Sequence, residues 1–508
     1  MIHSNFLVLQ NISYIIMTNR KEIVIIGAGL SGLSAASLLA KAGFNVKVIE
    51  KNDQPGGVSN RFSEKGYSFD TGPTWYLMPE VFEQFFSLFN KKSSDYYNLT
   101  QLDPSYRVFF NKNHYVDIKK DKNHTVNVFN ELENGGGEKL KKYLRDSEYK
   151  YNVAYNDFLY RDYKSIFDFF NRKLLLSGTK LHLFNNLDSY AKKYFKNKKA
   201  RQILEFNTVF LGCSPDRTPA LYSLMSHADI TTGVFYPEGG IYKLIDALYS
   251  LAKENGVKFY LNHNAEKINI HNNKVESIKT NNGSFKADIA LVASDYHFAE
   301  TQLIERKYQT YHEKYWDKRV LSPAVFLIFI GLKKKISILQ HHNLYLSENW
   351  DNHFESIFKT NSWPDNPSYY IGCNSKTDPG SVPLNCESLF ILVPVAPELD
   401  DSEEIREKFY NTIISHIEYL TGENIIDSIR FKKIFAHKDF IKKFNSYKGT
   451  SMGLAHTLFQ TAVFRPSHKS KKVSNLFYTG QYTHPGIGMP MVIISSQVVS
   501  DLIKEKYA

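Results

Sequence analysis

Cysteine is scarce in this sequence: the 508 residues include only three, at positions 213, 373 and 386. Being few and scattered, they provide neither a disulfide framework nor the ligand set of a zinc site. We therefore expect reduced thiols and a cytoplasmic protein. The 17 histidines form no H-x-x-x-H pattern on an expected helix, so no metal site is predicted. His341 and His342 are adjacent, and we expect both at the surface.

Long apolar runs are also missing. No stretch approaches 18 uninterrupted apolar residues, so no membrane-spanning helix is predicted. The first 16 residues lack the basic stretch and the small-residue cleavage site of a signal peptide, and Met17 stands just ahead of the first expected strand. We interpret residues 1–16 as a non-native N-terminal extension, with Met17 as the true start. A weak signal segment is the alternative.

Acidic residues are the minority, because 63 Lys and Arg stand against 52 Asp and Glu and give a formal charge of +11. The basic residues are dispersed and form no dense block interleaved with aromatic rings, so nucleic-acid binding is not predicted. Attraction to an anionic membrane surface stays open, since each basic residue near such a surface adds on the order of 1 kcal/mol. The length exceeds the roughly 250–300 residues of a single core, which predicts at least two domains.

Residues 22–51 carry the pattern of a dinucleotide-binding unit. The apolar run Ile23–Ile26 predicts a buried parallel strand. The apolar positions after it predict a helix that ends at Gly43, and a second strand follows at Val46–Ile49. This order of strand, helix and strand is the context in which a glycine-rich loop binds a dinucleotide.

Gly27, Gly29 and Gly32 form the glycine-rich loop G-x-G-x-x-G. Gly27 permits the tight turn, Gly29 lets the backbone approach a pyrophosphate, and Gly32 lets helix and strand pack closely. The helix N-terminus offers unpaired N–H groups to the phosphates. Glu50, 18 positions beyond Gly32, can accept the ribose hydroxyls, and an acid there disfavours a 2′-phosphate. FAD or NAD therefore fits better than NADP.

A second glycine pair distinguishes these two cofactors. Gly56 and Gly57 follow soon after the ribose acid, and the segment FDTGPT, residues 69–74, comes next. An NAD-binding unit has no obvious need for a second glycine loop, whereas flavoproteins that bind the longer FAD often have one. With these motifs the chain resembles the FAD-dependent amine oxidase and phytoene desaturase superfamily, in which the D-x-G segment leads the chain beneath the flavin. Val58 replaces the arginine that usually follows the glycine pair, and Arg61 is the candidate for its role.

A third block spans residues 236–297. Its apolar positions over 241–251 follow the i, i+3, i+4 spacing of a helix. Short strands are expected after this helix, over 257–261, 267–270, 275–279 and 287–293. In the resembling superfamily this block returns to the FAD domain, and the backbone near Ala265 meets the adenine. An ordinary α/β unit without a ligand contact is the alternative.

The stretch NLFYTGQYTHPGIGMP, which begins at Asn475, predicts a strand, a Pro- and Gly-rich loop and a helix. From the resemblance we expect Gly480 near the ribityl phosphate, and Gly486 and Gly488 along the isoalloxazine edge, where glycine allows close approach. Pro490 suits the first turn of the final helix. The positive end of that helix would stabilise charge on the reduced flavin by about 0.3–1 kcal/mol. A turn without a ligand is the alternative.

The resemblance extends from about Glu22 to the C-terminus. Segments such as FDTGPTWYLMPEVFEQFF, TPALYSLMSHAD, NSYKGTSMGLAHTL and LFYTGQYTHPGIGMP are similar to those of bacterial phytoene desaturases, and most similar to the Bacteroidetes form. The resemblance implies desaturation of phytoene toward lycopene: a hydride leaves an allylic carbon for flavin N5, and the neighbouring carbon loses a proton. It also implies an apolar C40 carotenoid as substrate, peripheral association with the membrane, and quinone or dioxygen as electron acceptor.

No Ser/His/Asp set, carboxylate pair or metal cluster stands out, and we assign no catalytic residue. A weak base suffices, because the proton becomes acidic once the allylic hydride has left. We expect His484 to shape its loop or to form a hydrogen bond, without a catalytic role. An apolar substrate requires an aromatic-lined tunnel, and Phe and Tyr are abundant, at 36 and 33 residues.

Other functions stay open. A carotenoid cis–trans isomerase would use reduced flavin without net oxidation, and a desaturase or saturase would act on a later carotenoid or a retinoid. A carotenoid-binding protein without activity would not need the intact glycine loops. An amine oxidase would need a paired aromatic cage, for which the sequence gives no evidence.

The predicted fold is α/β, with a discontinuous Rossmann-like FAD-binding domain over residues 17–100, 236–300 and 455–508. An inserted α+β domain for substrate binding and membrane association covers 101–235 and 301–454. The predicted cofactor-binding residues come from the glycine loops, the ribose acid, the D-x-G segment, the adenine contact and the C-terminal loop: Gly27, Gly29, Leu30, Ser31, Gly32, Glu50, Lys51, Gly56, Gly57, Arg61, Gly72, Pro73, Thr74, Ala265, Gly480, Gly488 and Met489.

Overall fold

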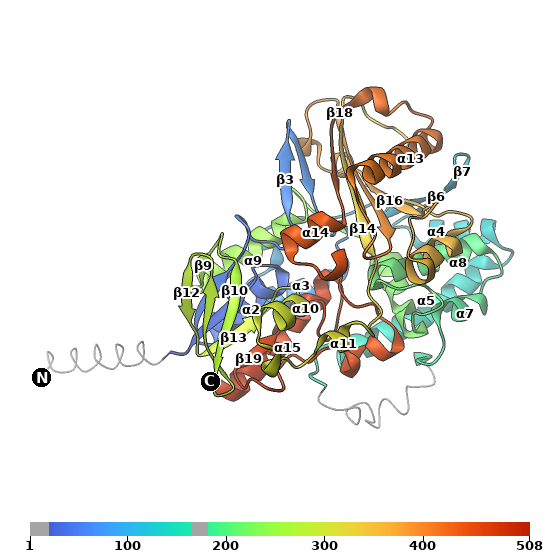
Figure 1. Ribbon diagram of the computed structural model, residues 1–508. Coiled ribbons are helices and arrows are strands. Elements are labelled where there is room, and N and C mark those ends of the chain that lie inside the picture. The colour runs from blue at the N-terminus through green and yellow to red at the C-terminus, as the bar shows by residue number, and fades with distance from the viewer. Residues whose placement is uncertain (1–19, 164–180) are drawn as a thin grey trace, which may run out of the picture.

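The computed structural model describes residues 20–163 and 181–508, so the expectation for residues 1–16 lies outside the described part of the chain. Two large sheets organise the fold (Figure 1). A five-stranded parallel sheet lies at the lower left of the view. A seven-stranded mixed sheet stands at the upper centre, with a group of helices to its right.

The parallel sheet joins three distant parts of the chain. Its strands, in spatial order, are β19 (Leu476–Tyr478), β13 (Ile289–Val292), β1 (Glu22–Ile26), β2 (Asn45–Ile49) and β9 (Lys258–Tyr260). All neighbouring strands run parallel. The strand order reverses beside β1, which is where open α/β sheets bind their ligands. The predicted α/β fold class, with a discontinuous Rossmann-like unit, is confirmed. The exact domain boundaries stay predictions.

Different layers cover the two faces of this sheet. Three helices cover one face: α2 (Leu30–Lys41), α9 (Tyr242–Glu254) and α15 (Met489–Tyr507). A small antiparallel sheet covers the other: β10 (Ala265–His271), β11 (Lys274–Thr280) and β12 (Gly283–Lys286). Ile23 and Ile25 pack against the helices, whereas Val24 and Ile26 pack toward the small sheet. Because both faces are buried, β1 needs the continuous apolar run from which it was predicted.

The seven-stranded sheet is antiparallel except where β15 and β6 pair. Its strands, in spatial order, are β18 (Ile429–Phe435), β14 (Ala324–Leu332), β17 (Glu387–Val395), β16 (Tyr369–Gly372), β15 (His342–Tyr345), β6 (Tyr106–Asn111) and β7 (His114–Ile118). Helix α13 (Glu403–Thr421) covers one face and packs against Phe326 and Ile328 of β14. The next residues of that strand, Leu327 and Phe329, point into the core on the opposite face.

Four helices share that second core: α4 (Lys122–Leu132), α5 (Gly136–Val153), α7 (Leu187–Lys192) and α8 (Lys198–Glu205). The shorter strands and helices are β3 (Arg61–Glu64), β4 (Tyr67–Asp70), α3 (Pro79–Ser87), β5 (Leu99–Gln101), β8 (Phe235–Pro237), α10 (Tyr296–Phe298), α11 (Glu313–Trp316), α12 (Trp350–Glu355) and α14 (His437–Phe444). The buried Asp70 carboxylate accepts hydrogen bonds from the N–H groups of Ile241 and Tyr242, so it ties the end of β4 to the start of α9.

The expectation that His341 and His342 lie at the surface is wrong, because their side chains are 4% and 0% exposed. His342 begins β15, an interior strand of the seven-stranded sheet. Its ring stacks on Trp75 with centroids 4.6 Å apart, and its Nδ1 lies 2.7 Å from the Tyr370 hydroxyl. Burial lowers the pKa of both imidazoles, that of His341 to about 3, so both rings are neutral.

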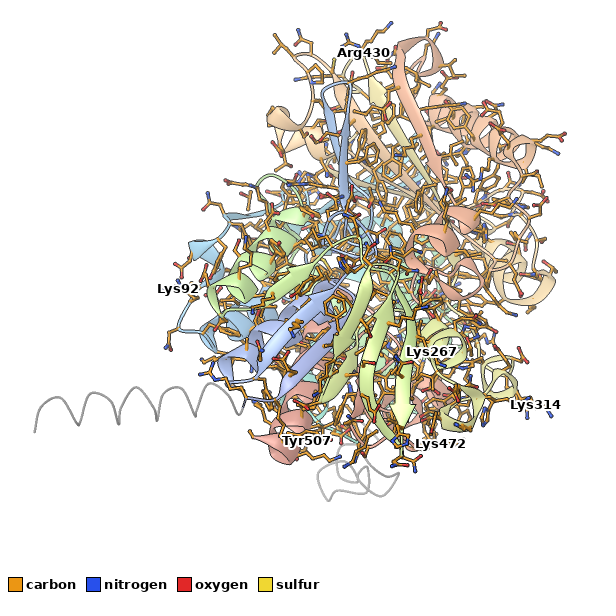
Figure 2. All side chains as sticks on the ribbon, turned by 60° about the vertical axis from the view of Figure 1, so that its left-hand side comes forward. Lys92, Lys267, Lys314, Arg430, Lys472 and Tyr507 are labelled. Carbon is orange, nitrogen blue, oxygen red and sulfur yellow. The ribbon has the colours of Figure 1, made fainter. Side chains whose placement is uncertain are left out.

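Among the helices of residues 20–163 and 181–508, none combines the length and the apolar character needed to cross a bilayer. Basic side chains lie on several sides of the molecule in this view, as Lys92, Lys314, Arg430 and Lys472 illustrate (Figure 2). The net charge is therefore distributed over the surface in this view and not gathered at one point.

Candidate active site

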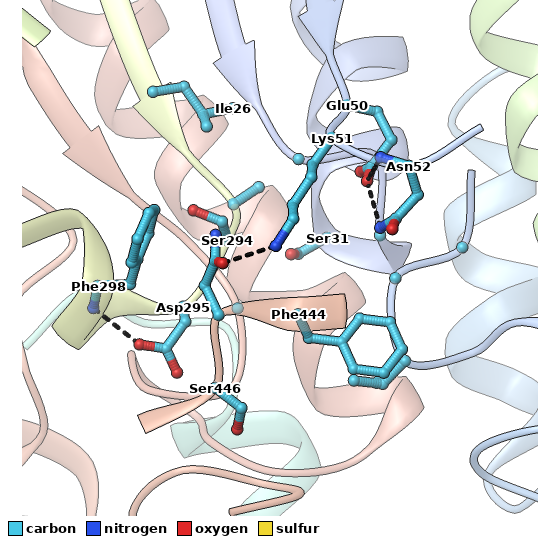
Figure 3. Close-up of a pocket in the computed structure, with 18 of the residues that line it drawn as sticks. Ile26, Ser31, Glu50, Lys51, Asn52, Ser294, Asp295, Phe298, Phe444 and Ser446 are labelled. Atoms are coloured by element: carbon cyan, nitrogen blue, oxygen red, sulfur yellow. Dashed lines mark hydrogen bonds between the residues drawn. The ribbon is translucent and has the colours of Figure 1, made fainter. Parts of the chain in front are cut away.

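A cleft lies at the carboxyl ends of the parallel strands (Figure 3). The residues that follow four of these strands line it: Gly27 after β1, Glu50 after β2, Ala293 after β13 and Thr479 after β19. Backbone N–H groups converge at such an edge, which suits a phosphate-bearing ligand. We call this hollow the nucleotide cleft.

The two glycine loops lie side by side at the floor of the nucleotide cleft. Gly29 and Gly56 form a parallel bridge, and the Gly56 N–H donates to the Ala28 carbonyl at 2.8 Å. Gly29 has an ordinary φ of −75°, and a Cβ added there would meet nothing closer than 3.9 Å. Packing within the chain thus does not require glycine at this position. The free space lies where a pyrophosphate would approach helix α2, whose N-terminus has no side-chain cap.

The other glycines of these loops are required by the chain itself. Gly27 has φ +106°, a backbone conformation that residues with a side chain rarely adopt. A Cβ on Gly32 would lie 2.1 Å from the Gly27 carbonyl oxygen. Gly56 has φ +123°, and its Cβ would approach the Ser59 carbonyl oxygen to 2.5 Å. Gly27 and Gly56 line the cleft, but Gly32 does not. Its predicted role in close packing of helix and strand fits this geometry.

Glu50 is fixed as a hydrogen-bond acceptor at the cleft wall. One carboxylate oxygen accepts the Ala28 N–H at 2.8 Å, and the other accepts the Asn52 N–H and side-chain amide at 2.9 and 2.8 Å. The residue is 5% exposed. Each carboxylate oxygen has two lone pairs, so acceptor capacity is left for ribose hydroxyls. The residues present therefore fit the adenosine and pyrophosphate parts of FAD.

Lys51 connects the nucleotide cleft to a distant part of the chain. Its ammonium donates to the Lys442 carbonyl at 2.6 Å and to Asn445 Oδ1 at 2.7 Å, at the end of α14. Burial lowers the pKa of Lys51, while Glu50 opposes this shift. Residues 443–446 line the cleft although they belong to the block that we assigned to the substrate domain. Phe444 and Ser446 therefore flank the cleft together with Lys51 (Figure 3).

The remaining predicted cleft residues divide clearly. Leu30, Ser31, Gly57, Ala265 and Gly480 line the nucleotide cleft with those already described. Arg61 does not. Its guanidinium lies over the ring of Tyr242, a buried residue of α9, and 3.4 Å from the carboxylate of Asp246, a partly exposed residue of the same helix. The sequence gives no sign of this, because the two partners lie about 180 positions downstream.

The C-terminal loop is held by a network of hydroxyl groups. The Gly480 N–H donates to Ser495 Oγ at 3.1 Å, and the Thr483 hydroxyl donates to the Gly480 carbonyl at 2.9 Å. Thr479 Oγ1 lies 3.0 Å from the same serine oxygen. Helix α15 starts at Met489 with a proline in its first turn, as Pro490 predicted.

The two loop glycines serve different purposes. A Cβ on Gly488 would meet nothing closer than 3.7 Å, and this residue lines a cavity. Gly486 lines neither hollow, because His456 fills the space beside it: its Cβ would lie 2.2 Å from His456 Nε2. The expected close approach of Gly486 to the flavin is therefore replaced by packing within the protein. His484 Nε2 lies 3.2 and 3.1 Å from the carbonyl oxygens of Phe158 and Leu159, in agreement with a hydrogen-bonding role.

A second, apolar cavity of about 370 Å³ adjoins the nucleotide cleft. The predicted residues Gly72, Pro73, Thr74, Gly488 and Met489 line it. Six of the described residues line both hollows, so the two are neighbours that share a wall: Leu30, Val58, Ser59, Ser451, Gln481 and Val492. A ligand as long as FAD can thus extend from the cleft toward the apolar cavity.

The described walls of the apolar cavity carry no charged side chain. Among the residues that the structure describes, no Asp, Glu, Lys or Arg lines it. Burial lowers the pKa of its histidines, His353 to about 4 and His456 to about 3, and raises the pKa of Tyr222 to about 12. These groups are all neutral at neutral pH. Within the same described ranges, no cluster of His, Cys, Asp and Glu could hold a metal ion.

The sequence did not reveal the aromatic residues of this cavity individually. Trp75, Phe206, Phe210, Trp350 and Tyr370 come from several elements of the second core. Only the FDTGPT motif pointed to the first of them, because Trp75 directly follows it.

Comparison with known proteins identifies the family of this chain. A model of the family described as flavin containing amine oxidoreductase matches residues 30–504. The chain belongs to this family. Members bind a flavin, and the nucleotide cleft fits FAD, so the protein is an FAD-dependent oxidoreductase. FAD would be held by the Gly29–Gly56 loops, Glu50 and the C-terminal loop.

Curated relatives of this member of the amine oxidoreductase family match it over nearly its whole length. It is 39% identical over 489 residues to a carotenoid 3,4-desaturase from Haloarcula japonica, covering 96% of this chain and 99% of the relative. It is 30% identical over 491 residues to a zeta-carotene-forming phytoene desaturase from Myxococcus xanthus, covering 95% and 94%. The resemblance to phytoene desaturases is thereby confirmed, while the Bacteroidetes type stays a prediction.

Solved structures share the fold of this family member. An oxidoreductase from Methanosarcina mazei has a TM-score of 0.63 at 17% identity, covering 94% of this chain and all of the other. A putrescine oxidase variant has a TM-score of 0.59 at 12% identity, covering 96% and 99%. At these identities the likeness concerns the fold alone.

Proposed function

We propose that the protein desaturates a linear carotenoid precursor, with phytoene as the first candidate. One observation carries the proposal: an uncharged, aromatic-rich cavity shares six wall residues with the FAD cleft. A charged substrate would lose its hydration there without gaining an ionic partner from the described walls, whereas a polyene has no charge to desolvate. The names of the relatives support the same substrate class.

The chain contributes orientation and exclusion of water in this proposal. FAD, when bound, supplies the acceptor for a hydride. The apolar walls, with Trp75 and Phe210 in ring contact at 5.3 Å, fix an extended chain by packing alone. They also keep water from a carbon that becomes cationic when the hydride leaves. Since the neighbouring proton is then acidic, the absence of an ionised base from the described walls is compatible with the reaction.

The test uses purified protein with FAD, a quinone, and liposomes that contain phytoene or, in parallel, a more conjugated carotenoid. We expect longer polyenes in the chromatogram together with reduction of the quinone. Dioxygen replaces the quinone in a second series, because both acceptors are compatible with the proposal. If only the more conjugated carotenoid were consumed, the proposed reaction type, desaturation, would be retained, but phytoene would be excluded as the substrate. Geometric isomers without reduction of the acceptor would favour the isomerase, and no change of either carotenoid would overturn the proposal.

We further propose that the protein meets its lipid-soluble substrate at a bilayer surface, through the segment around Phe459 and Phe464. These side chains are 70% and 38% exposed, and their rings are in contact at 5.8 Å. Arg217, Lys318 and Arg319 line the shallow depression beside Phe459. Exposed aromatic residues next to basic ones suit the interface of an anionic membrane.

The same segment adjoins the apolar cavity. The Thr461 hydroxyl, between the two phenylalanines, lies 3.4 Å from that of Tyr222, which lines the cavity. Gln460 anchors the segment, since its side-chain amide exchanges hydrogen bonds of 2.8 Å with the Val320 backbone. A substrate leaving the bilayer here would have a short path to the cavity.

Sedimentation with anionic vesicles tests this surface. The double variant F459S/F464S should lose most of its vesicle binding while keeping its FAD and its thermal stability. L384S is the matched control, because Leu384 is 91% exposed in another part of the chain. Equal binding by the wild type and the double variant would show that this surface is not the one that docks.

A further inference from the structure

Arg465 is a buried cation that the proposed chemistry does not use. The residue is 4% exposed, and its guanidinium donates only to backbone carbonyls among the described residues. Nε donates to Tyr482 at 3.1 Å and Nη1 to Gln460 at 3.0 Å. Nη2 donates to Gln481 at 2.5 Å and to Leu454 at 3.5 Å. These bonds give each of its three nitrogens a partner but supply no negative charge.

Within residues 20–163 and 181–508, no carboxylate forms an ion pair with this cation. No Asp or Glu occurs between Asp439 and Asp501, and the groups that act on the pKa of Arg465 are tyrosines. Burial lowers that pKa to about 10, so the guanidinium remains charged at neutral pH. Asp295 is reached only through the far end of the Tyr482 ring, whose hydroxyl donates to it at 2.9 Å. Burying an unpaired charge is costly, so its retention calls for an explanation.

The position of Arg465 suggests an explanation for this buried charge. Arg465 binds the carbonyls of Gln481 and Tyr482, and Gln481 lines both hollows while Tyr482 lines the nucleotide cleft. The guanidinium therefore stands directly behind the wall where cleft and cavity meet. Gly486 lacks a side chain on the same side: a Cβ there would lie 3.2 Å from Arg465 Cζ.

We propose that Arg465 is the counter-charge for the negative charge that FAD gains on reduction. A hydride brings two electrons and one proton, so the cofactor gains one negative charge, while Arg465 stays protonated throughout. In a poorly solvated site such a charge acts more strongly than in water. It favours the reduced state and so raises the tendency of FAD to take a hydride. Arg465 is a positioning residue that acts across the Gln481–Tyr482 backbone.

This inference depends on FAD and not on the identity of the substrate. Two variants separate charge from loop geometry: R465Q removes the charge, and R465K keeps it but loses part of the carbonyl contacts. FAD content and melting temperature are recorded first. Equilibration of the FAD-loaded proteins with a redox dye then gives the ratio of reduced to oxidised flavin at the wild-type midpoint.

We expect that ratio to fall at least tenfold in R465Q and to stay within threefold of the wild type in R465K. Equal falls in both variants would assign Arg465 a purely structural role, and no change in R465Q would overturn the proposal. If R465Q does not retain FAD, a measurement on the wild-type protein tests the proposal instead. The pH at which its reduced flavin turns from neutral to anionic must then lie below that of free reduced FAD, and an equal or higher value overturns the proposal.

Discussion

Gly29 and Gly56 lie against each other as a parallel bridge, although one belongs to the dinucleotide motif and the other to the second glycine loop. Gly57 continues the contact, because a Cβ there would lie 3.3 Å from Gly29 Cα. The two loops thus form one floor beneath the cofactor. Their glycines are not equivalent, and this difference can be tested.

Gly29→Ala should fold normally and bind FAD at least tenfold more weakly, a loss of about 1.4 kcal/mol or more. The added methyl group occupies free space in the cleft and touches no protein atom within 3.9 Å. Gly32→Ala is the contrasting variant, because its Cβ would clash with the Gly27 carbonyl and should lower the melting temperature. Flavin fluorescence and thermal melts measure the two effects. Unchanged FAD affinity in Gly29→Ala would contradict our assignment of the pyrophosphate site.

Glu50→Gln should weaken FAD binding by roughly tenfold to a hundredfold, or about 1.4–2.7 kcal/mol. Glutamine replaces one carboxylate oxygen by an amide nitrogen, which is a donor. The single remaining oxygen cannot accept all the hydrogen bonds from the chain and one from a ribose hydroxyl as well. Asp53→Asn is the matched control, since Asp53 is an exposed acid three positions away. Titration of the apoprotein with FAD gives both affinities. Similar affinities for the two variants would exclude the ribose role of Glu50.

Asp229→Asn should change the pH dependence of stability. Burial raises the pKa of Asp229 to about 7, although hydrogen bonds from Asn207 and Tyr106 oppose the shift. A carboxyl group whose folded pKa lies above its unfolded value of 3.8 stabilises the fold at low pH, and this stability is lost as pH rises through 7. Between pH 4 and 8 the wild type should lose up to about 4 kcal/mol relative to the variant.

Urea denaturation across this pH range measures that difference. The other buried carboxyl groups are the same in both proteins and cancel in the comparison. Asp216→Asn, at an exposed position, is the control. Parallel curves for the wild type and Asp229→Asn would show that Asp229 is ionised in the folded protein.

Phe210→Asp should abolish turnover of an apolar substrate while FAD remains bound. Its ring lies in the cavity wall, 5.3 Å from Trp75 and 5.8 Å from Phe206, and outside the nucleotide cleft. A carboxylate there would need solvation that the cavity does not provide. Phe210→Leu keeps the wall apolar and should retain most activity. Product analysis with equal FAD content is the readout, and an active aspartate variant would place the substrate elsewhere.

His484→Gln should keep FAD and retain turnover within about threefold. Burial lowers the pKa of His484 to about 3, so the imidazole is neutral, and Nε2 is engaged with two backbone carbonyls. Glutamine can donate to the same carbonyls. The rate is measured against pH in both proteins. A loss of several hundredfold that spares FAD content would instead make His484 the missing base.

The sequence indicated most of the residues that line the nucleotide cleft, but few of those that line the apolar cavity. Gly27, Gly29 and Glu50 lie within one strand–helix–strand unit, where spacing along the chain determines spacing in the structure. The cavity walls come from elements separated by hundreds of residues, so no local pattern marks Phe210 or Trp350.

Errors arose where long-range packing decides the environment. His341 and His342 are polar and adjacent, which is typical of a surface, but the partners of β15 enclose them. Gly486 suggested a ligand, yet His456 occupies the space beside it. The sequence did not indicate that Arg465 is buried near the cleft. Its hydrogen-bond acceptors are backbone carbonyls, which every residue has, so no acidic partner marks the site in the sequence.

The order of strands in the parallel sheet also constrains when the cofactor site can exist. Strand β19 pairs with β13 and forms the edge of the sheet on that side, yet it follows β1 by about 450 residues. At the synthesis rates of ribosomes, roughly 5–20 residues per second, this interval is on the order of 20–90 s. Throughout that time the first glycine loop exists without the wall that carries Gly480. The complete cleft for FAD can therefore form only when nearly the whole chain has been made.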